Sequence, residues 1–292
     1  GCTKLKTVSV NSSLKGVGDY AFSGCEALGS IDLSNGVSEI GEYAFNNCSS
    51  MKSIKFPSEG LTKIGSYCFQ NCTSLESIAV PGSVKTIGNY FCQGCIGLKE
   101  AVIELGSNRW VGENYFLDCT GLTNATISWY EELPGSLFKG CTSLKTVVLN
   151  NTKQISSSVF EGCTALESVS IPNTVKTIGL YAFKNCSALE NLIIPSSVTQ
   201  IKDEAFMGCS SLKQITIPED VTLLSKSVFE GCSSLESISL PTSLTEIGNR
   251  SLWGCSSLKK LDFPSQLTTV KNSAFVSCKN LLYLVFPSTM TK

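Results

Sequence analysis

The sequence predicts a repeat solenoid in which short parallel β-strands stack coil upon coil. Thirteen of the fifteen cysteines recur every 22 to 24 residues, from Cys2 to Cys278. Leucine stands three residues after nearly all of them, and phenylalanine three residues before most. Because a period of roughly 20–50 residues along a whole chain is typical of solenoids, residues 1–292 are expected to form one domain of about 12–13 repeats, truncated within a repeat at both ends.

Each element of the repeat follows from the consensus C-x-x-L-x-x-I-x-I-P-x-x-V-x-x-I-G-x-x-A-F-x-G. Branched residues six and eight positions after the cysteine, such as Ile215 and Ile217, alternate with period two and predict a short strand. Proline follows this strand in eight of thirteen units and ends the ladder, because it has no N–H to donate. Gly, Asn or Asp precedes the cysteine in eleven of twelve units, which predicts a left-handed turn at that position.

The unit, with its C-x-x-L-x-x-I-x-I-P core and A-F-x-G-C return, resembles the BspA-like class of leucine-rich repeats from Cys2 to Phe286. The resemblance implies a right-handed leucine-rich repeat solenoid. Its concave face would be a parallel β-sheet, and its convex face would hold short turns, 3-10 segments or β segments. The resemblance also implies a cell-surface or secreted protein that binds host proteins, matrix proteins or other cells. It carries over no catalytic residue.

Composition disfavours several classes of function. The 23 basic and 24 acidic residues form no basic block, which argues against binding to nucleic acid. No apolar run approaches the roughly 20 residues of a membrane helix, so no membrane insertion is expected in this segment. The absence of histidine removes Ser-His and Cys-His catalysis and imidazole ligands. We therefore expect a protein that is not an enzyme and has no cofactor.

The periodic cysteines are interpreted as buried free thiols that occupy one corner of every coil, since free cysteine is among the most buried residue types. Cys68 and Cys92 lie outside the period. With Cys72 and Cys95 they have the spacing of a zinc site, and a disulfide between Cys68 and Cys92 is a second alternative. The third interpretation is that Cys68 replaces the alanine of the repeat and Cys92 its phenylalanine, both as core residues.

A candidate ligand-binding site lies where the repeat is least regular, at about residues 99–158. Glu104, Ser128 and Asn150 replace the proline there, and Trp110 and Trp129 fall in the same window beside Arg109 and Tyr130. The candidate residues are the outward positions of the three strands expected in this window and the aromatic pair that follows the middle strand. They are Glu100, Val102, Asn124, Thr126, Trp129, Tyr130, Thr146 and Val148. The tryptophans either form an exposed anchor for a ligand or fill gaps left by the altered spacing.

The resemblance implies a surface-displayed or secreted module, and together with these patterns it predicts binding of a protein ligand through the extended sheet face and the irregular repeats 99–158. A glycan is a further candidate ligand. The alternative is a structural spacer or an intracellular scaffold without a dedicated ligand. The sheet face favours this alternative to some degree, because it nearly lacks the aromatic and Arg residues typical of binding hot spots.

Overall fold

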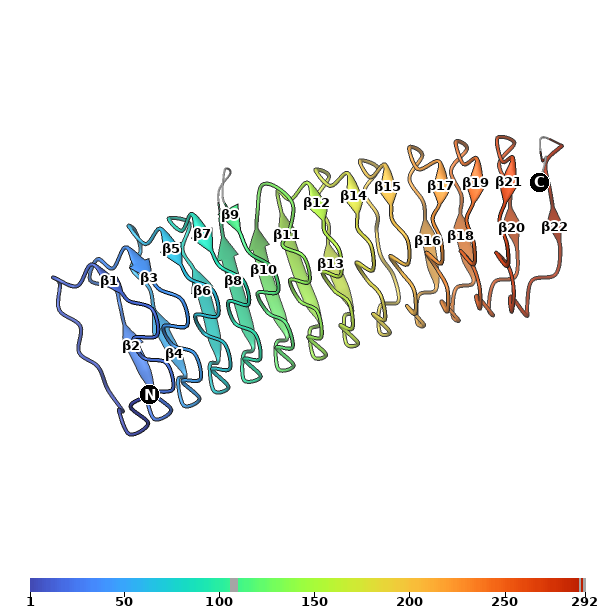
Figure 1. Ribbon diagram of the computed structural model, residues 1–292. Helices are drawn as coiled ribbons and strands as arrows, with labels where there is room; N and C mark the ends of the chain where they lie inside the picture. Colours follow the sequence, from blue (N-terminus) through green and yellow to red (C-terminus); the bar gives the residue numbers. More distant parts are fainter. Residues whose placement is uncertain (106–109, 289, 291–292) are drawn as a thin grey trace. The chain divides into compact units, whose positions relative to one another are not determined.

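The computed structural model describes residues 1–105, 110–288 and 290, without the side chains of Trp110 and Val111. Its contacts divide the chain into two compact units, Gly1–Asn150 (unit 1) and Asn151–Lys292 (unit 2). Both are parallel β-solenoids built from the predicted coil, with 22 strands in two rows among the described residues (Figure 1). That residues 1–292 form a single domain stays a prediction.

In unit 1, the first strand row contains the predicted strands. They are β2 (Ser30–Asp32), β4 (Ser53–Lys55), β6 (Ser77–Val80), β8 (Glu100–Glu104), β10 (Asn124–Ser128) and β11 (Thr146–Asn150). The second strand row comprises β1 (Gly16–Val17), β3 (Glu39–Ile40), β5 (Lys63–Ile64), β7 (Thr86–Ile87) and β9 (Trp110–Val111), paired in that order. All of these pairings are parallel, and each joins one coil to the next.

Unit 2 repeats the arrangement with shorter strands. Its first row is β13 (Ser168–Ser170), β16 (Gln214–Thr216), β18 (Ser237–Ser239), β20 (Leu261–Asp262) and β22 (Leu284–Val285). Its second row is β12 (Gln154–Ile155), β14 (Thr177–Ile178), β15 (Gln200–Ile201), β17 (Leu223–Leu224), β19 (Glu246–Ile247) and β21 (Thr269–Val270). The described residues of both units contain no helix. Of the turns, 3-10 segments and β segments expected on the face opposite the first row, the structure has β segments and turns.

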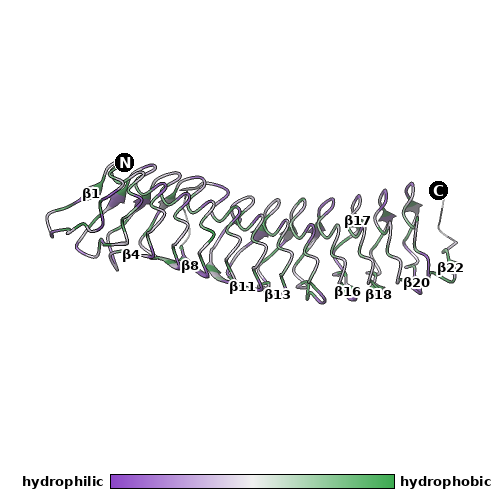
Figure 2. Cartoon of the chain, turned by 90° about the horizontal axis from the view of Figure 1, so that it is seen from below, coloured by the Kyte–Doolittle hydropathy of each residue, from purple (hydrophilic) through white to green (hydrophobic). Residues whose placement is uncertain are grey.

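The core of each coil consists of the residue types that recur in the consensus. The leucine after the cysteine, the inward strand residues and the phenylalanine before the cysteine are almost all inaccessible to solvent, as shown by Leu212, Ile215 and Phe206. Outward positions are mostly polar, so each coil carries both hydrophobic and hydrophilic stretches (Figure 2). Successive phenylalanines stack face to face; Phe206 lies 5.3 Å from Phe183 and 5.4 Å from Phe229 between ring centroids. Burial on this scale is what holds coils together, because one coil has too little apolar surface to fold alone.

The thiols of the repeat lie in this core and are hydrogen-bonded. All fifteen cysteines are free, eleven of the thirteen periodic ones are buried, Cys278 is half-buried and Cys2 is exposed. In most coils the thiol donates to the carbonyl oxygen of the phenylalanine position in the preceding coil, as Cys209 Sγ does to Phe183 O at 3.1 Å. Burial raises the pKa of the Cys209 thiol to about 12. The predicted burial of the periodic thiols is therefore confirmed, and the structure adds the carbonyl that each thiol meets.

The return segment of each coil, five to one residues before the periodic cysteine, forms a third ladder that we call the turn ladder. Its N–H groups donate to carbonyls of the next coil, as Phe45 N does to Cys68 O at 2.9 Å. The residue before the cysteine has positive φ in every complete unit, from Gly24 at 67° to Ser277 at 65°, which confirms the predicted left-handed turn. A second left-handed residue lies four positions earlier, and the sequence pattern did not predict it. These residues are Tyr20, Tyr43, Tyr67, Tyr90, Asn114, Ser136, Ser158, Tyr181, Glu204, Ser227, Arg250 and Ser273.

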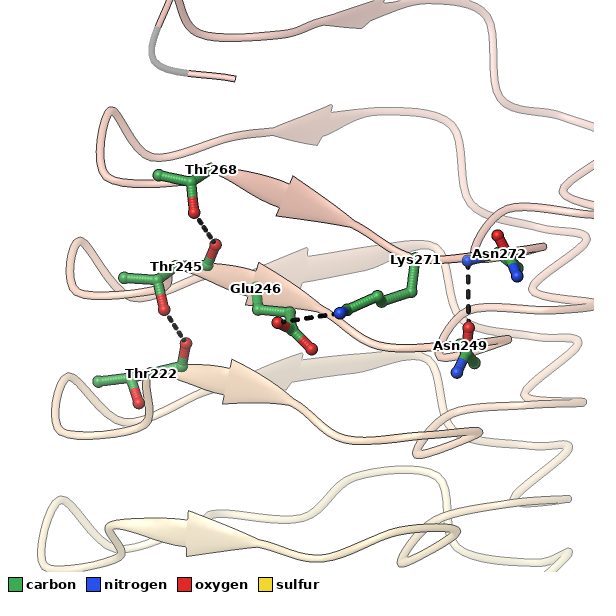
Figure 3. A network of polar contacts seen from close by, with 7 residues as sticks. All are labelled: Thr222, Thr245, Glu246, Asn249, Thr268, Lys271 and Asn272. Atoms are coloured by element: carbon green, nitrogen blue, oxygen red, sulfur yellow. Dashed lines mark hydrogen bonds and ion pairs between the residues drawn. The ribbon is translucent and has the colours of Figure 1, made fainter. Parts of the chain in front are cut away.

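Polar side chains also align from coil to coil. In unit 2, the hydroxyl of Thr245 donates to Thr222 O at 3.1 Å and that of Thr268 to Thr245 O at 3.2 Å (Figure 3). On the same surface Lys271 Nζ lies 3.6 Å from Glu246 Oε2. Both side chains of this ion pair are more than a third exposed, so the pair contributes little to stability. The hydroxyl ladder matters more for register, because each hydroxyl meets a carbonyl of the neighbouring coil only when the coils are aligned.

Candidate binding surface

The three longest strands of the chain lie side by side in unit 1. Strands β8, β10 and β11 have five residues each, whereas the strands that precede a proline have two to four. Glu104, Ser128 and Asn150 stand where other coils have proline, and the parallel pairing continues through all three. Without proline the N–H donor is present, so the ladder can include this position. Absence of proline alone does not lengthen a strand, because β2, which has Ser34 at this position, has three residues. The predicted irregular window therefore contains the most extensive sheet in unit 1.

Six of the eight candidate residues share the outward face of these strands. Asn124 pairs in register with Glu100 on one side and Thr146 on the other. Thr126 pairs in the same way with Val102 and Val148. The intervening residues Ala101, Ala125 and Val147 point into the core and are buried. The outcome is two parallel rows, a polar one formed by Glu100, Asn124 and Thr146, and a more apolar one formed by Val102, Thr126 and Val148.

Hydrogen bonds join two of the three residues of the polar row. Thr146 Oγ1 donates to Asn124 Oδ1 at 2.6 Å, and Asn124 Nδ2 donates to Thr123 Oγ1 at 3.0 Å. Thr123 Oγ1 in turn donates to Lys99 O at 2.9 Å. These side chains are exposed yet held in one orientation, so a ligand would meet them without first ordering them. In the apolar row the Val148 side chain is 42% exposed, which makes it the principal apolar contact on this face.

An open hollow of about 620 Å³ adjoins the polar row. Lys52, Glu76, Lys99 and Glu100 line it together with three small residues, so its rim carries charges of both signs. Glu100 therefore belongs both to the face of β8 and to this hollow. Such a mixed rim suits a polar or zwitterionic surface on a ligand rather than a deeply buried apolar group.

The two aromatic candidates after β10 have different environments. The prediction of an exposed anchor is wrong for Trp129, which is 3% exposed with its ring centroid 6.2 Å from that of Tyr115. Tyr115 itself stands where the repeat has alanine, is fully buried and donates its hydroxyl to Ile87 O at 3.2 Å. Trp129 thus fills space in the irregular coils, as the second interpretation proposed. Tyr130 is 46% exposed, so it remains available to a ligand at the edge of the sheet.

The remaining residues that drew attention to this window lie outside the described part of the chain. The backbone of Trp110 in β9 pairs with that of Thr86 in β7, but the Trp110 side chain is not among the described ones. Arg109 falls within residues 106–109, which the description omits entirely. Neither residue enters the candidate surface.

Cys68 and Cys92 occupy core positions of the repeat. Both are buried free thiols, Cys68 at the alanine position and Cys92 at the phenylalanine position. Phe91, one residue before Cys92, stands at the alanine position of the same coil, and its ring meets that of Phe69 edge to face with centroids 5.5 Å apart. In this coil the large ring and the small side chain have thus exchanged positions. Burial raises the pKa of both thiols well above the usual range. Within the described residues no three Cys, Asp or Glu side chains are grouped as metal ligands. The interpretation of both as core residues is the one that the structure supports.

The described part of the chain has no helix of the length and hydrophobicity needed to cross a membrane. Stacked coils, a parallel first strand row and a ladder of buried leucines define a leucine-rich repeat protein. The family model of the BspA type leucine rich repeat region, in six copies, matches residues 1–123, 93–190 and 176–292. The chain belongs to the BspA-type leucine-rich repeat family.

A solved structure agrees with this assignment. A leucine-rich repeat protein from Bacteroides ovatus is 30% identical, with 94% of this chain and 77% of that chain covered and a TM-score of 0.73. A leucine-rich repeat protein of T. pallidum is 31% identical over 52% of this chain and 72% of that chain, with a TM-score of 0.46. No functionally curated protein matches the sequence.

Proposed function

We propose that the chain is a non-enzymatic module of a cell-surface or secreted protein and that it binds a protein ligand through the outward face of β8, β10 and β11. The observation that carries the proposal is the coincidence of the longest paired strands with two side-chain rows in register on one face. Membership of a repeat family whose members are commonly surface proteins supports the location. A protein ligand is proposed before a glycan because leucine-rich repeat proteins typically bind proteins.

The face can bind in a specific way. Val148 and the methyl groups of Val102 and Thr126 give an apolar strip, and Glu100 with the amide of Asn124 gives hydrogen-bonding groups beside it. An apolar centre bordered by polar groups is the usual composition of a protein interface. Tyr130 lies beyond the end of β10 as an exposed aromatic side chain, and tyrosine is enriched among the residues that dominate binding energy.

The proposal is tested with Val148→Glu and Tyr130→Ser combined in one variant. Binding is measured to cells and to an immobilised panel of fibronectin, laminin and collagen. The charge would disrupt the apolar strip and the serine would remove the aromatic contact, so binding is expected to weaken at least about tenfold. Trp129 is left unchanged, because its replacement would open a cavity and confuse loss of binding with loss of folding.

The matched control is Ser239→Glu, which places the same charge at the equivalent outward position of β18 in unit 2. If the wild type binds a surface in the panel and the Val148/Tyr130 variant binds it equally well with an unchanged circular dichroism spectrum, this face is not the site. Absence of binding to every surface would favour the spacer alternative.

A further inference from the structure

A stack of four tyrosines lies on the turn ladder of unit 1, away from the proposed sheet-face site. Tyr20, Tyr43, Tyr67 and Tyr90 follow one another at the same position of successive coils. Their ring centroids are 4.8, 4.6 and 4.9 Å apart, with interplanar angles of 5°, 6° and 11°. Tyr20 is 59% exposed and the other three are half-buried. We call these residues the tyrosine stack.

The backbone at these positions does not favour tyrosine. All four residues have φ between 54° and 56°, a region that bulky side chains rarely adopt. At the equivalent position other coils use small residues such as Ser136 and Ser158, with φ of 53° and 58°. Stacking between neighbouring rings offsets this strain. The four stacked rings form a half-exposed aromatic surface.

The turn segments that carry the tyrosine stack contain carboxylates but no cationic side chain. The five turn segments at residues 19–24, 42–47, 66–71, 89–94 and 113–118 contain four carboxylates and no Lys or Arg. Asp19 and Glu42 directly precede the first two tyrosines of the stack. One equivalent segment of unit 2 supplies its own cation: Lys184 Nζ lies 4.5 Å from the Tyr181 ring centroid and 2.9 Å from Glu204 Oε2. The five segments that carry or adjoin the tyrosine stack present aromatic and acidic groups without a Lys or Arg of their own.

We propose that the tyrosine stack, together with Asp19 and Glu42, binds a basic protein segment, namely an extended peptide rich in Arg or Lys. Stacking covers the ring faces, so the exposed parts are ring edges and hydroxyls. Among the described residues no hydrogen bond involves the four hydroxyls, which leaves them free for guanidinium or ammonium donors. The alkyl stems of Arg and Lys pack on apolar edges while their charges reach the carboxylates. This surface is independent of the sheet-face site.

The test uses a fluorescein-labelled octa-arginine peptide and fluorescence anisotropy, with octa-glutamate as the comparator. In extended form the peptide is about 27 Å long, enough to follow all four rings. The main variant is Tyr43→Ser with Tyr67→Ser, because serine occupies the same left-handed position in other coils and keeps every charge unchanged. Affinity for octa-arginine is expected to fall at least about tenfold. The matched control, Tyr181→Ser in unit 2, should leave the affinity unchanged.

Further variants separate the contributions. Tyr43→Phe with Tyr67→Phe keeps the stack and removes two hydroxyls, so it reports on binding even if the serine variant fails to fold. Glu42→Gln should weaken binding and reduce its dependence on salt. Equal affinity of the wild type and a folded serine variant would overturn the proposal, because the binding would then be general electrostatic attraction. Absence of octa-arginine binding, or binding of a neutral oligosaccharide such as cellohexaose instead, would also overturn it.

Discussion

Alkaline pH should unfold this protein, because its core contains many thiols that must stay neutral. Burial raises the pKa of five buried thiols that titrate independently of their neighbours: Cys68, Cys186, Cys209, Cys232 and Cys255. Cys72, Cys92, Cys95 and Cys119 interact with one another, and the pKa of Cys95 is lowered, so these four thiols do not add to the same effect. In the unfolded chain a thiol has a pKa of about 8.5. The native state therefore holds protons that the unfolded state loses above that pH, so the free energy of unfolding decreases as pH rises from about 8.5 towards the native pKa values.

The magnitude follows from the linkage relation. At pH 10 a thiol that ionises only in the unfolded state favours unfolding by about 2 kcal/mol, since pH 10 is 1.5 units above its unfolded pKa. Five such thiols together favour unfolding by about 10 kcal/mol, which is comparable with the roughly 5–15 kcal/mol by which typical domains are stable. The limiting slope is about 7 kcal/mol per pH unit for the five thiols, against about 1.4 for one. Stability should change little below about pH 7.5.

The assay is urea unfolding followed by far-UV circular dichroism at pH 7.5, 8.5, 9.0 and 9.5, with a reductant present to prevent disulfide formation. The urea midpoint is expected to fall steeply above pH 8.5. Cys2→Ala should leave this slope unchanged because Cys2 is exposed, whereas Cys209→Ala should reduce it by about 1.4 kcal/mol per pH unit. A midpoint that stays constant to pH 9.5 would refute the reasoning, because it would mean that the thiols can ionise without loss of the fold.

Two further predictions concern the packing between coils. Gly179→Ala places a Cβ 2.7 Å from the carbonyl carbon of Ser156 in the preceding coil. The substitution should therefore lower the free energy of unfolding, measured by urea titration, by about 1–3 kcal/mol. Gly29→Ala has open space at its Cβ and should change the free energy of unfolding by much less. Phe206→Ala removes a fully buried ring from the phenylalanine stack and should cost about 3–5 kcal/mol in the same measurement, and an unchanged urea midpoint would contradict the packing described here.

The features of the fold that depend on one coil were predictable from the sequence. Proline after the strand, the left-handed residue before the cysteine and burial of the periodic thiols each follow from local chemistry, and all three are observed. The second left-handed position was not predictable, because tyrosine, serine, glutamate and arginine all occur there. No common side-chain property identifies it, since the hydrogen bonds of the turn ladder impose that conformation from the neighbouring coil.

The candidate surface shows the same division. That Glu100, Asn124 and Thr146 would align was predictable from their common distance to the periodic cysteines, and the register places them side by side. The burial of Trp129 was not predictable in the same way. It depends on Tyr115, which belongs to another part of the coil and takes the place of an alanine. A contact between two substituted positions depends on how the coils are spaced in three dimensions. A repeat consensus describes the average coil and carries no such information.

In this chain, the positions where the repeat departs from its consensus are the best indicators of function. Every coil needs its leucine, cysteine and phenylalanine, so those residues report on stacking and are equivalent along the chain. Glu104, Ser128 and Asn150 break the proline rule, and the strands that end with them form the most extensive sheet of unit 1. The tyrosine stack is different, because its position has no consensus residue and four consecutive coils share tyrosine there. Both features create surface that the fold itself does not require, which is why the two binding proposals rest on them.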